Sequence, residues 1–112
     1  MKDKTKDAEQ RPLETLVRSE YILCAAIYYA DGKARVHQPK NINSGIVVCG
    51  RRHHNCLAIM SEFLEKPNRT KIIQGFLTNT DRFVDRQEAA KIALEAGQVD
   101  SDLSRLVSED VY

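Results

Sequence analysis

Apolar residues recur along the chain in two ways, as short continuous runs of strand length and as stripes with helical spacing. Residues 21–29 form an apolar and aromatic run, and residues 45–50 form a shorter run that ends in glycine. A third run covers residues 70–78, in which Gly75 indicates a bulge or a close backbone approach. Runs of this length and composition are typical of buried strands, so together they predict the main strands of a sheet.

A hairpin is predicted directly after the first of these runs. Asp31 and Gly32 form a dipeptide that favours a tight turn between antiparallel strands. The return strand is expected over residues 34–37, with Ala34 and Val36 alternating on its apolar face. The stretch that follows contains a proline and two asparagines, which indicates a loop before the second apolar run.

The spacing of apolar side chains predicts a first amphipathic helix after residues 51–55. Its stripe follows the spacing i, i+3, i+4, i+7 and i+8, at Cys56, Ile59, Met60, Phe63 and Leu64. Pro67 stops this helix because proline cannot continue the backbone hydrogen bonds.

A second amphipathic helix begins at Asp85, which forms a capping-box-like start with Glu88. It carries a narrow stripe of mostly alanine residues, and Gly97 ends it. Shorter helices are expected over residues 13–17 and 103–107, where apolar side chains also recur at helical spacing.

These elements predict an α+β fold, with a small antiparallel or mixed sheet packed by two main helices. The length of 112 residues suits one domain with one hydrophobic core. Residues 1–11 are charged and contain no large apolar residue except Met1, so we expect a flexible N-terminal arm. Residues 12–112 are then expected to form a single α+β ligand-binding domain.

Composition narrows the class of protein without defining an activity. Hydrophobic residues make up 42% and charged residues 29% of the chain, as in an ordinary globular protein. No run approaches the roughly 18–20 apolar residues needed to cross a bilayer, and no apolar signal core follows the polar N-terminus. We therefore expect a cytosolic protein with no membrane partner. The odd number of cysteines, at Cys24, Cys49 and Cys56, favours reduced thiols.

Charge is distributed unevenly although the formal net charge is only +1. Residues 33–72 contain eight basic and two acidic residues, a local charge of +6, and residues 98–112 carry −3. This asymmetry indicates an anion-binding surface or a contact between subunits, and a solvated face with an acidic tail is the plain alternative. A pI of 7.7 and the lack of a helix-turn-helix pattern argue against DNA binding.

Two strand-to-helix junctions carry the residues best suited to binding. At the first, Arg51, Arg52 and His53 precede a predicted helix, whose N-terminal amides and dipole favour an anion. Arginine adds forked hydrogen bonds to phosphate. A pair of basic residues on a solvated turn is the alternative reading.

At the second junction, aromatic residues lie close in sequence to arginines. Phe76 is followed after a short turn by Arg82, Phe83 and Arg86. A phenylalanine beside arginines can hold a base by stacking while the arginines hold its phosphates. Alternatively, both phenylalanines belong to the core and the arginines to the surface.

Metal and cofactor sites are not predicted. Cys49 and Cys56 lie seven residues apart, and the chain has no pair of cysteines with the close spacing of zinc ligands. No glycine elbow or other catalytic signature surrounds the serines. General acid–base catalysis by His53 or His54 remains the one enzymatic alternative.

Three segments give the chain a resemblance to a known family when they are taken in order. They are the strand with Ala25, Ala26 and Ile27, the turn from Gly50 to His53, and the stretch from Gln74 through Arg86 and Ala89 to Gln98. Over roughly residues 21–98 the chain resembles small phage proteins of the Thoeris anti-defence type one family.

The resemblance implies a protein that sequesters a cyclic ADP-ribose-type immune signal, made by Toll/interleukin-receptor domain proteins, without degrading it. It implies a homo-oligomer, a dimer or a hexamer, in the host cell cytoplasm, and some family members also hold cyclic oligonucleotides. It further implies pockets shared between subunits, with Asn79 nearby and lined by Ala26, Ile27, Arg51, His53, Phe76, Arg82 and Arg86. Two alternatives stand beside this expectation, a phosphodiester-cleaving enzyme that uses His53 and His54, and a protein-interaction module.

Overall fold

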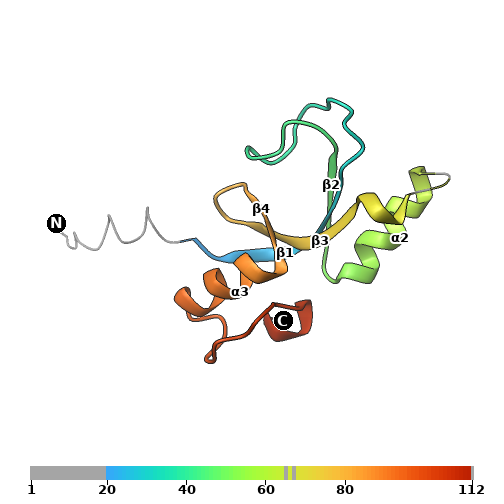
Figure 1. Cartoon of the computed structure of the whole chain (residues 1–112). Coiled ribbons are helices and arrows are strands. Elements are labelled where there is room, and N and C mark those ends of the chain that lie inside the picture. The colour runs from blue at the N-terminus through green and yellow to red at the C-terminus, as the bar shows by residue number, and fades with distance from the viewer. Residues whose placement is uncertain (1–19, 65, 67, 112) are drawn as a thin grey trace.

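The computed structural model describes residues 20–64, 66 and 68–111, which form an antiparallel sheet with helices packed on it (Figure 1). The strands lie in the order β2-β1-β3-β4, and every neighbouring pair is antiparallel. The predicted α+β class is confirmed, and the sheet is antiparallel rather than mixed. The arm over residues 1–11 and the helix over residues 13–17 lie outside the described residues.

The three apolar runs of the sequence form the three longer strands, and a short fourth strand joins them. The strands are β1 Ile22–Tyr29, β2 Ile46–Gly50, β3 Ile72–Thr78 and β4 Phe83–Asp85. A one-turn 3-10 helix, Arg69–Lys71, leads into β3. The pattern did not predict β4, because three residues are too few to produce an alternation.

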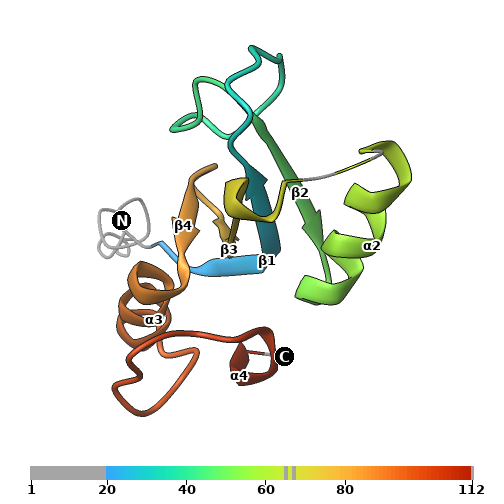
Figure 2. The same ribbon diagram turned by 45° about the vertical axis from the view of Figure 1, so that its right-hand side comes forward.

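The helices are α2 His53–Phe63, α3 Arg86–Glu95 and the short α4 Ser108–Val111. Helix α2 packs against β1 and β2, α3 against β3 and β4, and α4 against β1 between them. All three lie on one side of the sheet, as both views show (Figures 1 and 2).

The core lies between this side of the sheet and the helices. Ala25, Ile27 and Phe76 point toward the helices and are fully buried. They meet Met60 of α2 and the alanine stripe of α3, of which Ala93 is fully buried. The alanine side chains of α3 are thus buried against the sheet.

The opposite side of the sheet is partly covered by the long segment between β1 and β2, not by a hairpin. Asn41 holds this segment against β4, because its side chain donates to the Phe83 carbonyl at 2.8 Å and accepts from the Phe83 amide at 2.9 Å. The predicted return strand over residues 34–37 is wrong. Strands β2 and β3 already occupy both edges of β1, and the Asp31 carboxylate folds the chain locally by accepting hydrogen bonds from Arg35.

Gly75 confirms the predicted close approach of two backbones. A Cβ atom at this position would stand 2.1 Å from the Val84 carbonyl oxygen and 2.8 Å from the Phe83 ring. Only glycine therefore allows β4 and the Phe83 ring to lie flat against β3 at this point.

The ends of α3 follow the sequence signals, whereas the last helix does not. The Asp85 carboxylate accepts a hydrogen bond from the Glu88 amide at 2.8 Å, and Gly97 adopts a φ of 77° just after the helix. The predicted helix over residues 103–107 is wrong, and helix α4 forms after this segment instead. Leu106 is instead held at the start of α3, where its amide donates to the Arg86 carbonyl at 2.9 Å.

Candidate functional site

The first junction places basic residues at the N-terminus of α2. Arg52 is the N-cap in an extended conformation, and the Asn55 side chain accepts a hydrogen bond from its amide at 3.0 Å. The first turn of α2 contains no acidic residue. The positive end of the helix dipole thus meets a basic side chain, an arrangement that is unfavourable by itself and favourable for a bound anion.

His53, the first residue of α2, is turned inward to the sheet. Its side chain is 8% exposed, and Nε2–H donates to the Gly75 carbonyl oxygen at 2.7 Å. The ring stands edge-on to Phe76, with 5.0 Å between the ring centroids. Because a carbonyl oxygen can only accept, this contact fixes the proton on Nε2.

Burial lowers the pKa of His53 below its usual range, and the nearby charge of Arg86 acts in the same direction. The Gly75 carbonyl and Glu109 oppose this shift without reversing it. His53 is therefore a neutral side chain near neutral pH. Its neighbour His54 is exposed, so the two imidazoles do not share one environment.

At the second junction, the side chain of Arg86, the first residue of α3, points toward the same part of β3. Its Nη2 donates to the Gln74 side-chain oxygen at 2.6 Å, and Gln74 directly precedes the Gly75 that holds His53. The Nε atom of Arg86 is shielded from solvent and has no hydrogen-bond partner among the described residues. A buried guanidinium N–H without an acceptor is costly, and an anionic ligand would supply the acceptor.

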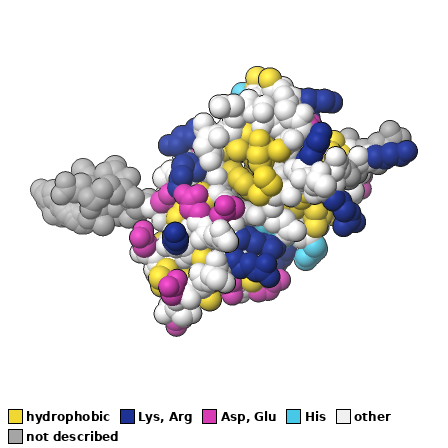
Figure 3. Space-filling view, in the orientation of Figure 1, with side chains coloured by type: hydrophobic (Ala, Val, Ile, Leu, Met, Phe, Trp, Pro, Cys, Tyr) yellow, Lys and Arg dark blue, Asp and Glu magenta, His cyan; other side chains and the backbone are white. Residues whose placement is uncertain are grey.

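We call this group the basic cluster, and it consists of Arg51, Arg52, His53, Gln74 and Arg86. In Figure 3, Lys and Arg side chains gather between the start of α3 and the start of α2, with histidine beside them. Acidic side chains lie below, over α4, in agreement with the effect of Glu109 on His53. The two strand-to-helix junctions thus meet at adjacent residues of β3, where His53 binds Gly75 and Arg86 binds Gln74.

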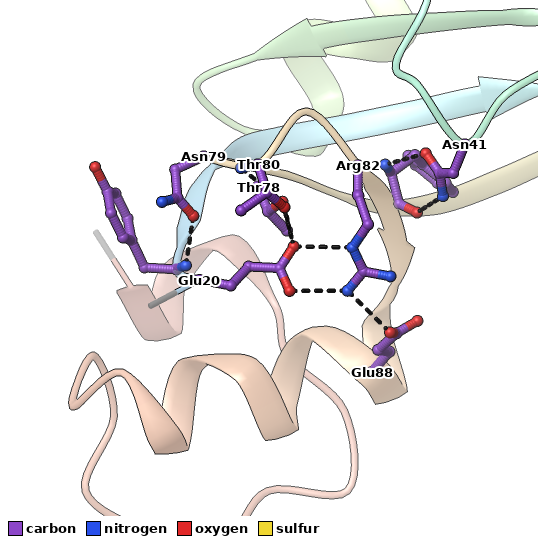
Figure 4. A network of polar contacts seen from close by, with 9 residues as sticks. Glu20, Asn41, Thr78, Asn79, Thr80, Arg82 and Glu88 are labelled. Carbon is purple, nitrogen blue, oxygen red and sulfur yellow. Dashed lines mark hydrogen bonds and ion pairs between the residues drawn. The ribbon is translucent and has the colours of Figure 1, made fainter. Parts of the chain in front are cut away.

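Arg82 does not join the basic cluster, because it is held by carboxylates at the turn between β3 and β4 (Figure 4). Its guanidinium donates to both carboxylate oxygens of Glu20, at 2.8 and 2.9 Å, and contacts Glu88 at 3.2 Å. Thr78 also donates to Glu20, at 2.6 Å. The hydrogen bond from Arg82 lowers the pKa of Glu20 to about 2, and Thr78 contributes in the same direction.

The remaining candidate residues are either buried beneath the protein surface or distant from the basic cluster. Ala26, Ile27 and Phe76 have no solvent-exposed surface in the described chain. Phe83 is also buried, on the side of the sheet that lacks helices. Its ring packs against Tyr28, with 5.7 Å between the ring centroids. Asn79 is exposed in the turn after β3 and accepts a hydrogen bond from the Tyr21 amide at 2.7 Å.

Three residues in or near the basic cluster and the Arg82 ion pair were not singled out in the sequence. Gln74 is a polar residue inside an apolar strand, which is a usable signal because its side chain needs a partner when buried. Glu20 and Glu109 carry no such signal, because Glu20 binds a residue far away in sequence and Glu109 acts on distant His53 through its charge. Only the fold brings them to Arg82 and His53.

Within the described residues, no group of three or more His, Cys, Asp or Glu side chains could hold a metal ion. Cys24, Cys49 and Cys56 are all free thiols. None of the described helices has both the length and the apolar composition to cross a membrane.

The fold and the basic cluster define a small α+β protein with a cationic site at two adjacent helix N-termini. The family model described as phage T4 y16D protein matches residues 21–112, and the chain belongs to this family of phage proteins. Comparison with curated proteins and with solved structures found no match. The family description names a phage protein and no activity.

Proposed function

We propose that this phage protein is an anti-defence protein that binds and sequesters a cyclic ADP-ribose-type immune signal without degrading it. One observation carries the proposal. Arg86 and His53 form hydrogen bonds to adjacent residues of β3, Gln74 and Gly75. A cyclic oligonucleotide offers the same phosphate chemistry and is a second candidate ligand. The resemblance over residues 21–98 supplies the class of signal, and membership of a phage family agrees with it.

The phosphates of such a ligand would bind in the basic cluster. Arg86 is positioned by Gln74 and still has a buried Nε–H to donate. The N-terminus of α2 adds backbone amides and the positive end of its dipole, with Arg51 exposed beside it. Charge-assisted hydrogen bonds of this kind contribute about 1.5–3 kcal/mol each.

Phe76, Ala26 and Ile27 support the site without touching the ligand in this proposal. Phe76 packs against the His53 ring and fixes its orientation from below. Ala26 and Ile27 are buried in β1, and Ile27 pairs with Gln74 in the ladder. These residues therefore set the position of His53 and Gln74.

The arrangement of the histidines favours binding over turnover. Phosphodiester cleavage by His53 and His54 requires both side chains at one reacting phosphate. The Nε2–H of His53 is engaged by a backbone carbonyl, whereas His54 points to solvent. The basic cluster therefore supplies cationic donors but no matched acid and base.

We also propose that the protein acts as a homo-oligomer, a dimer or a hexamer. Several large apolar side chains are more than a third exposed, among them Leu23, Ile59 and Ile73. Burial of such residues between copies is a common source of subunit association. Size-exclusion chromatography with light scattering tests this part, and a monomeric mass at micromolar concentration would contradict it.

Isothermal titration with cyclic ADP-ribose isomers tests the binding proposal directly. We expect saturable binding, and heating the complex should release the ligand with its mass unchanged. Absence of binding by every isomer and by cyclic dinucleotides would refute sequestration. Release of a cleaved product would instead support the enzymatic alternative.

A pair of variants on α3 tests whether the basic cluster is the site. Arg86→Gln removes the charge and should weaken binding by roughly 10–100-fold. Lys91→Gln removes an exposed charge from the same helix and serves as the matched control. Equal affinities for both variants, with unchanged thermal unfolding, would place the ligand elsewhere.

A further inference from the structure

Two of the three cysteines lie next to each other on the side of the sheet that faces away from the helices. Strands β1 and β2 pair Ala26 with Cys49 and Ala25 with Gly50. Cys24 is two residues before Ala26, so its side chain points to the same side as Cys49. The two side chains are therefore diagonal neighbours on one face of the β1–β2 pair.

This pair can be reached from solvent, whereas the third cysteine cannot. Cys49 is exposed and Cys24 is half-buried. Cys56 is fully buried on the helix side of β1, where its Sγ lies 3.6 Å from the Ala25 carbonyl oxygen. The chain therefore contains its own control thiol for any reaction at the surface.

We propose that Cys24 and Cys49 form a reversible dithiol–disulfide pair, a modification site that reacts with small-molecule disulfides such as oxidised glutathione. The proposal rests on the register of β1 and β2, which places both side chains on one face, and on the access of solvent to this pair. It is independent of the function proposed for the basic cluster.

The reaction consists of two thiol–disulfide exchanges. The Cys24 thiolate attacks one sulfur of oxidised glutathione, forms a mixed disulfide and releases one glutathione thiolate, which takes up a proton. Cys49 then loses its proton to solvent, attacks the Cys24 sulfur and displaces the second glutathione. Two protein thiols are oxidised, and one glutathione disulfide is reduced to two thiols.

The interaction between the two side chains favours Cys24 as the attacking group. It lowers the pKa of Cys24 to about 7, and the same interaction raises the pKa of Cys49. A thiol whose pKa lies near the ambient pH combines a large thiolate fraction with good nucleophilicity. Cys49 then serves as the resolving thiol.

The position of the pair in the sheet indicates a strained bond. Diagonal neighbours on paired strands have Cα atoms about 7–8 Å apart, beyond the roughly 4.4–6.8 Å that most disulfides span. Cys24 lies just beyond the last β1–β2 pair and beside the register shift in the β1–β3 pairing, so bond formation requires a shift of this end of β1 toward β2. The remaining strain makes the disulfide easy to reduce.

Mass spectrometry of the whole chain after incubation with oxidised glutathione tests the proposal. We expect the loss of two hydrogen atoms, a Cys24–Cys49 linkage in the peptide map, and full recovery after dithiothreitol. The linkage should close the loop from β1 to β2 and raise the melting temperature on the order of 10 °C.

Three variants make the result decisive. Cys49→Ser should retain one glutathione on Cys24, Cys24→Ser should form no internal bond, and Cys56→Ala should react like the unchanged protein. Stable glutathione adducts on the unchanged protein, or a disulfide between two copies through Cys49, would overturn the proposal. Loss of the internal bond in Cys56→Ala would overturn it equally.

Discussion

The ion pair between Glu20 and Arg82 gives the sharpest test of how the chain is held before β1. Glu20 accepts two hydrogen bonds from Arg82 and one each from Thr78 and Thr80, and its side chain is 19% exposed. Glu20→Gln keeps the size and shape of the side chain but removes its charge. The variant should therefore lose the charge-assisted part of these contacts and little packing.

The pKa of Glu20 gives the magnitude of the effect. A pKa lowered from 4.5 to about 2 corresponds by linkage to roughly 3 kcal/mol of stability. Both side chains keep some contact with water, which reduces this figure to about 1–2 kcal/mol. We therefore expect a fall in melting temperature of roughly 5–10 °C at pH 7.

The sign of the pH dependence follows from the direction of the shift. The folded state holds the Glu20 proton less tightly than the unfolded state, so the stabilisation is complete above pH 4.5. It is lost as the pH falls from 4.5 toward about 2. The difference between the unchanged protein and Glu20→Gln should shrink through this window.

Urea unfolding followed by circular dichroism at pH 7, 4 and 3 measures this difference. Glu95→Gln, at the exposed end of α3, is the control for loss of one negative charge. A variant as stable as the unchanged protein at pH 7 would refute the reasoning. A loss of the same size at all three pH values would show that the charge of Glu20 is not its cause.

Three further predictions follow from single contacts. Gly75→Ala should destabilise the fold by more than about 2 kcal/mol in urea unfolding, because its Cβ would meet the Val84 carbonyl at 2.1 Å, and a smaller loss would contradict the close approach. Glu109→Gln should tighten binding of cyclic ADP-ribose severalfold, because it removes a negative charge that acts on His53. Unchanged affinity in titration calorimetry would argue against this electrostatic effect. The His53 ring should titrate below pH 6.5 in NMR spectra, and a midpoint above that value would contradict its burial.

The sequence predicted those parts of the fold that depend on local signals. The spacing from Cys56 to Leu64 located α2, and Asp85 and Gly97 marked the ends of α3. The hairpin at Asp31 failed because a turn signal cannot reveal that β2 and β3 occupy both edges of β1. Pairing of distant strands overrode a favourable local dipeptide.

The same limit applies to the candidate site. Arg82 and Arg86 are four residues apart and look equivalent in the sequence, yet their partners differ. Glu20, far away along the chain, engages Arg82 at both carboxylate oxygens, while Arg86 turns to Gln74 on β3. No spacing rule distinguishes the two arginines. Their different roles arise because the fold brings Glu20 to Arg82 and Gln74 to Arg86.

Among the described residues, the side-chain nitrogen atoms that are shielded and lack an acceptor lie in the basic cluster, at Nη1 of Arg52 and Nε of Arg86. At the N-terminus of α2 a basic residue, Arg52, occupies the N-cap against the helix dipole, and the first turn has no acidic residue to offset it. Beside it, Arg86 keeps a shielded Nε–H without an acceptor among the described residues. Helix α3, by contrast, has the acidic cap Asp85 that its dipole favours. We therefore expect the basic cluster to be the place where a bound anion would offset these charges.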